Sequence, residues 1–229
     1  MSRLPDSYTR HPRTILWLVR EGECTIGDDD KDRVPAFRVH VGSFYLGKRP
    51  ITNRQYEAFA PGHPRADPSS GDDDPVSGVN FHEAASYCRW YADVSRKPIR
   101  LPTEVEWEYA CRAGSAARYF FGDDPAQGDR YLIDAANGNG RTAGLDVLKP
   151  NRFGLQGMLG GVWEWTASLH LPYPARDGDE RNDLDADGPR VLRGGSYRVA
   201  RGDLGSAVRR GADPTTRADD IGFRIARTF

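Results

Sequence analysis

Cysteine is scarce in this chain: its 229 residues contain three, Cys24, Cys88 and Cys111, and none follows residue 111. No two of them have the CxxC spacing that is typical of zinc sites and redox-active pairs. Three widely spaced thiols favour free cysteines in a reducing compartment, and we therefore expect a cytoplasmic protein. A single disulfide with one thiol left over is the alternative.

Long hydrophobic runs are also missing. The apolar run at residues 15–19 is far shorter than the roughly 20 residues that cross a bilayer as a helix. The formal net charge is −1, so no excess of basic residues attracts nucleic acid or an anionic membrane surface. Neither nucleic acid nor a membrane is expected as a partner.

Glycine and proline, in contrast, are abundant, with 25 and 16 residues, and they predict many turns and long loops. Short apolar or alternating runs predict strands. The run at 44–48 is expected to pair with the run at 37–41 across a turn at residues 42–43. The two runs nearest the C-terminus are expected to lie close together in a central sheet. The predicted strands cover 14–19 with a continuation at 21–27, then 37–41, 44–48, 191–193 and 222–226.

Three helices are predicted from their capping residues. Residues 52–53 precede a short helix over 54–59, and Asn80 begins a second helix. Thr103, with Glu106 three residues later, forms a capping box at the start of the third.

The third predicted helix should end with Gly114 at its C-cap. Trp107 is expected to face inward. Glu104 and Glu108 are expected on its solvated face, where they would have no catalytic use.

No composition change divides the chain into independent parts. Residues 1–13 are expected to form a flexible tail, and residues 14–229 a single domain. The mixture of short strands, short helices and long loops indicates an α+β fold with little regular secondary structure.

Seven motifs occur in a fixed order along the chain, and together they resemble the sulfatase-modifying-factor family, which includes the formylglycine-generating enzyme. The resemblance covers nearly the whole chain, from Gly22 to Ala226. It implies an irregular C-type-lectin-like fold with a small twisted sheet and long ordered loops. The motifs are EGExTIG at 21–27, FYLG at 44–47 with ITN at 51–53, VNF at 79–81, LPTE at 101–104, NxFGL at 151–155, VWEW at 162–165 and RGGS at 193–196.

The resemblance implies three possible uses of this scaffold. The first is copper-dependent formylglycine synthesis, which needs two cysteines soon after the Gly-Gly-Ser-Tyr turn. Those two positions here are Val199 and Leu204, and neither side chain can hold Cu(I), so this activity is not expected.

The second use is iron-dependent sulfoxide synthesis, for which relatives supply three histidines from a separate helical domain. The five histidines of this chain are scattered, without HxH or HxxxH spacing. A copper- or iron-dependent oxidoreductase with an unrecognised site stays open as the alternative function.

No cofactor is certain, but the resemblance implies a structural Ca²⁺ near the VWEW motif. Two positions that carry side-chain ligands in relatives are glycines here, at 157 and 161, which weakens such a site because Ca²⁺ takes about 6–8 oxygen ligands. The alternative is that Glu164 hydrogen-bonds the loop backbone directly. The expected ligands are Gly160, Val162 and Glu164, with Asn137 at a second site.

The third use is non-catalytic ligand display, as in the variable proteins of diversity-generating retroelements, and we favour it. The expected surface combines segment 197–220 with the loops at 168–190, and its ligand is an unidentified protein or small molecule. Arginine and tyrosine are well suited to recognition, although the arginines could instead pair with acids and fix the loops. Trp163 and Trp165 are expected in the core. The expected ligand-binding residues are Tyr197, Arg198, Val199, Ala200, Arg201, Asp203, Arg209, Arg210, Arg217 and Asp219.

Overall fold

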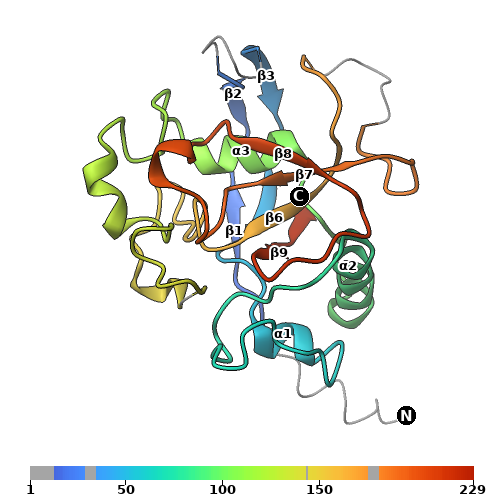
Figure 1. Cartoon of the computed structure of the whole chain (residues 1–229). Coiled ribbons are helices and arrows are strands. Elements are labelled where there is room, and N and C mark those ends of the chain that lie inside the picture. The colour runs from blue at the N-terminus through green and yellow to red at the C-terminus, as the bar shows by residue number, and fades with distance from the viewer. Residues whose placement is uncertain (1–12, 29–34, 143, 175–180) are drawn as a thin grey trace.

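The computed structural model of the protein describes residues 13–28, 35–142, 144–174 and 181–229 (Figure 1). Of the tail predicted at 1–13, only Arg13 is among them. Short strands and helices are joined by long loops, as the sequence predicts. The helices are α1 (Asn53–Glu57), α2 (Phe81–Ser95) and α3 (Glu104–Arg112), with 3-10 turns η2 (Pro125–Arg130), η3 (Leu145–Val147) and η4 (Arg201–Asp203). The strands are β1 (Leu16–Val19), β2 (Gly22–Ile26), β3 (Phe37–Val41), β4 (Phe44–Gly47), β5 (Ile99–Arg100), β6 (Trp163–Leu169), β7 (Arg190–Arg193), β8 (Arg209–Ala212), β9 (Ile221–Phe223) and β10 (Ala226–Thr228).

The strands form two four-stranded sheets and one hairpin. The first sheet has the order β1-β4-β10-β5 and is antiparallel throughout. The second has the order β8-β7-β6-β9, in which β6 and β9 run parallel and the other pairs antiparallel. The single strand predicted over 222–226 is wrong, because this segment divides between β9 and β10, which enter different sheets. The segment at 191–193 lies in the same sheet as β9, with β6 between them.

The predicted pairing of segment 44–48 with segment 37–41 is wrong. β3 pairs instead with β2, opposing Val41 to Gly22, whereas β4 lies between β1 and β10. The burial patterns explain the difference. β3 alternates between half-buried and exposed residues, which suits a hairpin that projects from the body, while β4 is buried along most of its length and needs neighbours on both sides.

The predicted starts of α2 and α3 are confirmed, whereas the short helix predicted over 54–59 is α1, which begins one residue earlier and ends at Glu57. Thr103 Oγ1 accepts a hydrogen bond from the Glu106 backbone N–H at 3.2 Å, and Glu106 Oε2 accepts one from the Thr103 N–H at 2.8 Å. Asn80 and Glu83 form the same reciprocal pair at α2. The predicted end of α3 is one residue late, because the C-cap is Ala113 in the left-handed region, with φ 46°, and Gly114 follows it.

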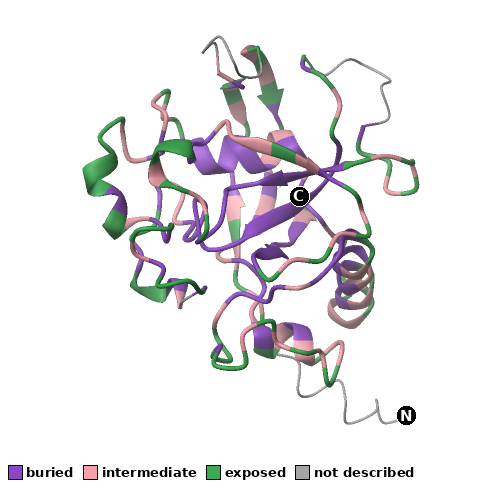
Figure 2. Ribbon diagram, in the orientation of Figure 1, coloured by how far each residue is buried: buried purple, intermediate pink, exposed green. Residues whose placement is uncertain are grey.

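Two large hydrophobic clusters form the core (Figure 2). One lies between α2 and the β8-β7-β6-β9 sheet and includes Trp163 and Trp165, whose predicted core positions are confirmed. The other joins Trp107 and its neighbours on α3 to the first sheet and the hairpin. Among the described residues, no helix is both long and apolar enough to cross a bilayer.

Two strands of the second sheet have no counterpart among the predictions. All seven residues of β6 are buried, so the segment lacks the polar alternation by which a half-exposed strand is recognised. β8 consists of Arg-Arg-Gly-Ala, which has little intrinsic strand propensity. Pairing with neighbouring strands, and not their own sequence pattern, makes these two segments strands.

Candidate functional site

The candidate site begins at a glycine turn that follows β7. Gly194 and Gly195 have φ values of 95° and 76°, which favour glycine. A Cβ atom on Gly195 would lie 2.1 Å from Leu204 Cδ2, so a side chain there would displace Leu204. Ser196 Oγ then donates to Asp220 Oδ2 at 2.7 Å. The segment between residues 196 and 220 is therefore fixed at both ends.

Val199 and Leu204 meet the hydrophobic core at the same place. Leu204 is fully buried in the cluster around Trp107, and Val199 is half-buried and packs against that cluster. The Leu204 carbonyl accepts a hydrogen bond from Arg118 Nε at 2.9 Å. These two positions therefore form an aliphatic contact, which gives them no metal-binding or redox chemistry.

Arg209 points into the protein instead of forming part of an exposed surface. Its Nε and Nη2 atoms donate to the two carboxylate oxygens of Glu104 at 2.7 and 2.9 Å. Its guanidinium carbon lies 4.4 Å from the ring centroid of Tyr173. A paired fork of this kind is a strong, directional contact, and it places Arg209 among the structural residues.

The solvated face predicted for Glu104 and Glu108 is wrong, because both carboxylates are buried. Helix α3 lies between the hairpin and the second sheet, so each of its faces meets other elements. Glu108 accepts hydrogen bonds from Arg193 on β7 and, at 2.8 Å, from Arg112 Nε. Burial of these carboxylates depends on Arg193 and Arg209, which come from distant strands, and on Arg112 of the same helix.

Arg201 holds the loops beside the segment together. Its Nε donates to Asp134 Oδ2 at 2.5 Å, and its Nη2 donates to Asp129. The bond from Arg201 to Asp129, with a second bond from Asn137, lowers the pKa of the Asp129 carboxyl. Asn137 Oδ1 accepts from the Asp134 N–H at 2.9 Å, so the predicted calcium ligand Asn137 has a structural partner.

Six of the ten predicted ligand-binding residues are exposed. Arg198 lies over the Tyr197 ring, which is itself buried, and forms an ion pair with Asp219. Arg217 donates to both carboxylate oxygens of Glu83 at 3.1 and 2.6 Å. Burial acts to raise the pKa of Glu83, but the bonds from Arg217 and the Asn80 backbone outweigh it and lower the pKa. The exposed residues are Arg198, Ala200, Asp203, Arg210, Arg217 and Asp219.

A polar cavity of about 310 Å³ lies next to this segment, beyond Leu204. Gly205 and Val208 line one side, and Arg112 and Arg118 line another. Arg118 also donates to the Gly202 carbonyl, so it connects the cavity wall to η4. The cavity adds a polar hollow to this surface, lined by two guanidinium groups and by the carboxylates of Asp28 and Asp123.

The three cysteines are free, as predicted. Cys88 and Cys111 belong to different hydrophobic clusters. Burial raises the pKa of the Cys24 thiol to about 11 and that of Cys111 to about 12. Thiols with such values are protonated at neutral pH and are weak nucleophiles and ligands.

Comparison with known proteins identifies the family. The family model for the sulfatase-modifying factor enzyme 1-like domain matches residues 2–229. This chain belongs to that family.

Two relatives of this chain are named as different enzymes. The formylglycine-generating enzyme of Streptomyces coelicolor is 34% identical over 183 residues, which cover 71% of this chain and 55% of the relative. The hercynine oxygenase of Mycolicibacterium smegmatis is 30% identical, over 86% of this chain and 55% of the relative. The chain thus spans about half the length of these two relatives.

The solved structure of Treponema denticola variable protein 1 has the same fold. Its TM-score is 0.83 at 22% identity, and the match covers 93% of this chain and 95% of that one. The predicted C-type-lectin-like α+β fold is confirmed.

Within this family fold, Glu164 has protein partners for both carboxylate oxygens. Arg224 Nε and Nη2 donate to it at 2.6 and 2.7 Å, and Trp107 Nε1 donates at 2.7 Å. Gly160 and Val162 lie beside it, buried in the turn before β6. The Arg224 guanidinium thus pairs with the carboxylate that the calcium prediction assigns to the metal. Over the described ranges, no three His, Cys, Asp or Glu side chains are grouped as a metal site requires. The calcium prediction stays a prediction, and the partners of Glu164 are the side chains of Arg224 and Trp107, not the loop backbone expected in the alternative.

Sequence reasoning missed the Glu164–Arg224 pair, although both residues lie in or beside recognised motifs. Glu164 belongs to the VWEW motif and Arg224 to the strand predicted at 222–226, and nothing in their spacing indicates that the two side chains meet. The parallel pairing of β6 with β9, which opposes Trp165 to Phe223, brings them together.

Proposed function

We propose that this family member is a non-catalytic binding protein that presents the exposed part of segment 198–219 to a protein or small-molecule ligand. The observation that carries the proposal is the aliphatic contact at Val199 and Leu204, the two positions at which the family resemblance calls for cysteines. A buried leucine at one of them removes the thiolate pair that would hold copper.

The arrangement of the segment supports a role in display. Arg198, Arg210 and Arg217 project from a backbone whose ends are fixed by Ser196 and Asp220. A rigid backbone that carries exposed arginines loses little conformational entropy on binding. The fold shared with a variable protein is compatible with such a surface.

The alternative is a metal-dependent oxidoreductase, which the 30% identity to a hercynine oxygenase favours. The two proposals differ in what they expect of copper and of iron. We expect the wild-type protein to bind neither Cu(I) nor Fe(II) stoichiometrically in anaerobic titrations and to leave a cysteine-containing sulfatase peptide unchanged. The double variant V199C/L204C should gain a Cu(I) site, and the single variant L204C serves as its control. Stoichiometric copper together with peptide oxidation, or stoichiometric iron, on the wild type would overturn the binding-protein proposal.

The binding surface has its own test. Quantitative capture from an extract of the source cells would compare the wild type with R198A/R210A/R217A and with R89A, which carries its substitution at an exposed position on α2. We expect a partner that the wild type and R89A retain and that the triple variant loses. Equal retention by all three proteins would contradict the assignment of this surface.

A further inference from the structure

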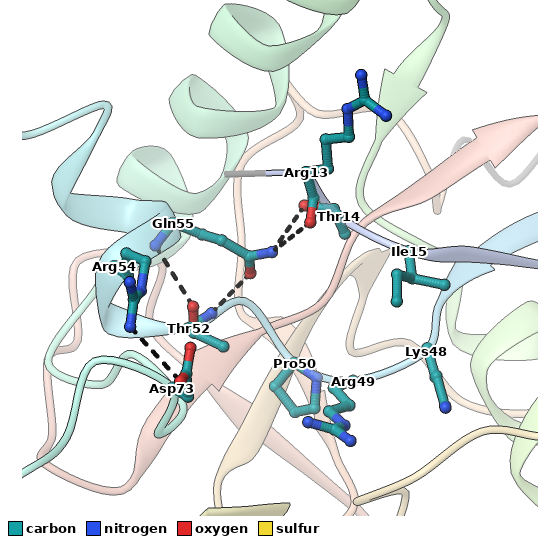
Figure 3. Close-up of a pocket in the computed structure, with 10 residues that line it drawn as sticks. All are labelled: Arg13, Thr14, Ile15, Lys48, Arg49, Pro50, Thr52, Arg54, Gln55 and Asp73. Carbon is teal, nitrogen blue, oxygen red and sulfur yellow. Dashed lines mark hydrogen bonds and ion pairs between the residues drawn. The ribbon is translucent and has the colours of Figure 1, made fainter. Parts of the chain in front are cut away.

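A second cavity, of about 280 Å³, lies between the start of β1 and the loop from β4 to α1 (Figure 3). Its wall includes Thr14, Ile15, Lys48, Arg49, Pro50 and Gln55, and no residue of segment 197–220 lines it. We propose that this cavity binds a small ligand with an anionic head, such as a phosphate, sulfate or carboxylate group, on a short apolar body.

Hydrogen bonds hold the walls of the cavity in place. The Lys48 backbone N–H donates to the Ile15 carbonyl at 2.9 Å and ties the loop to β1. Gln55 Nε2 donates to Thr14 Oγ1 at 3.2 Å, and Gln55 Oε1 accepts from the Thr52 N–H at 3.0 Å. Figure 3 shows Gln55 reaching across from α1 to the β1 side. The cavity is therefore formed before any ligand arrives.

Positive charge in the cavity exceeds negative charge. Four cations and one acid line it, and Arg54 is balanced by Asp72 and Asp73, at 3.3 and 3.5 Å. In Figure 3, Arg54 and Asp73 lie at one end of the cavity, and Lys48 and Arg49 lie at the other.

Lys48 and Arg49 are half-buried, and their charges are not balanced. Arg49 Nε donates to the neutral Gln156 Oε1 at 2.9 Å, and Lys48 Nζ lies 5.7 Å from the Trp17 ring centroid. Neither cation has an acidic partner in the part of the chain that the structure describes. Two partly desolvated cations are an unfavourable arrangement that an oxyanion would relieve, and the terminal nitrogens of Arg49 offer it a two-pronged contact.

Apolar surface adjoins the charged end. Ile15 is 60% exposed although it borders the cavity, and the Trp17 ring beside Lys48 is 41% exposed. Pro50 forms a buried part of the wall. The small volume limits the body of the ligand to about the size of a single ring, below the usual range for larger organic ligands.

Calorimetric titration with defined probes tests the proposal. The anionic probes are phenyl phosphate, phenyl sulfate and benzoate, and they distinguish the possible head groups. Benzyl alcohol is the neutral probe, and inorganic phosphate is the head group alone. We expect at least one anionic aromatic probe to bind, and benzyl alcohol and inorganic phosphate each to bind roughly tenfold more weakly or worse, because charge-assisted hydrogen bonds and apolar contact both contribute.

Two variants locate the binding. K48M/R49M should weaken binding of the anionic probe about tenfold or more. Since Arg49 also contacts Gln156, I15D provides a second variant at an exposed position, where the new carboxylate should repel the anion without disturbing the fold. K97M, at an exposed position after α2, is the matched control and should bind as the wild type does. Equal binding of benzyl alcohol, unchanged affinity in both cavity variants, or no binding of any probe at millimolar concentration would overturn the proposal. None of these results bears on segment 198–219, so the proposed function is tested separately.

Discussion

The arginines between residues 193 and 224 fall into a buried group and an exposed group, and the sequence around them does not distinguish the two. Arg193, Arg209 and Arg224 have side chains that are at most 7% exposed, and each contacts a buried carboxylate of α3 or β6. Arg198 and Arg217, by contrast, are 54% exposed and pair with acids at the surface. Arginine content alone therefore does not define a recognition surface in this fold.

Strand geometry explains how adjacent arginines reach different surroundings. Arg209 and Arg210 are neighbours in β8, and successive side chains of a strand point to opposite faces. Arg209 meets Glu104 in the interior, whereas Arg210 is exposed. The inner group stabilises the fold, and only the outer group is available for a partner.

The largest expected effect comes from breaking an inner pair. Arg224→Met should lower the free energy of unfolding by about 3–5 kcal/mol, because it leaves the Glu164 carboxylate buried without its cation. Denaturant unfolding measures the loss. Arg210→Met is the matched outer control and should change stability by no more than about 0.5 kcal/mol. Similar losses in both variants would remove the distinction between the two groups.

An intermediate effect is expected at Arg201, which is part inner and part outer. Its partner Asp134 is fully buried, and Asp129 is largely exposed. Arg201→Ala should cost about 1–3 kcal/mol, since Asp134 loses a charged donor and keeps only neutral ones. Arg201→Lys should recover part of this stability, because one ammonium cannot reach both acids as a guanidinium does. Wild-type thermal stability of the alanine variant would contradict the clamp.

The smallest expected effect concerns the outer pair of Glu83 and Arg217. Because the pKa of Glu83 is lowered in the folded protein, its stabilising contribution is complete above the ordinary glutamate pKa and is lost as the pH falls through the lowered value. At pH 7, Glu83→Gln should cost less than about 1 kcal/mol, and the difference from wild type should vanish in acid. Unfolding curves from pH 7 to pH 3 measure this. A difference that grows in acid would show that the sign is wrong.

Much of the fold could be predicted because local chemistry specifies it. The capping boxes at Thr103 and Asn80 place α3 and α2 through contacts within four residues. The apolar and alternating runs place β1, β3 and β4. The pairing of β3 could not be read in the same way, because pairing depends on burial of the neighbouring strands and not on the strand itself.

The candidate site was predicted less completely than the fold. Exposure of Arg198 and Arg217 agrees with the expected surface, but Glu104 and Glu108 follow the solvated pattern of a helix in sequence and are buried in the structure. Glu108 has one local partner, Arg112, but Arg193 and Arg209 lie far away in the chain, and only the tertiary fold brings them to these carboxylates. The same holds for the cavity at Lys48 and Arg49, which local sequence features do not reveal.

The placement of β9 and β10 has a consequence for the order of assembly. Ile221 pairs with Trp163 in one sheet, while Ala226 pairs with both Leu46 and Arg100 in the other. During synthesis, β4 and β6 must remain without these partners until residues 221–228 have left the ribosome. Neither four-stranded sheet can be complete before then, so closure of the fold is a late step that joins strands far apart in the sequence.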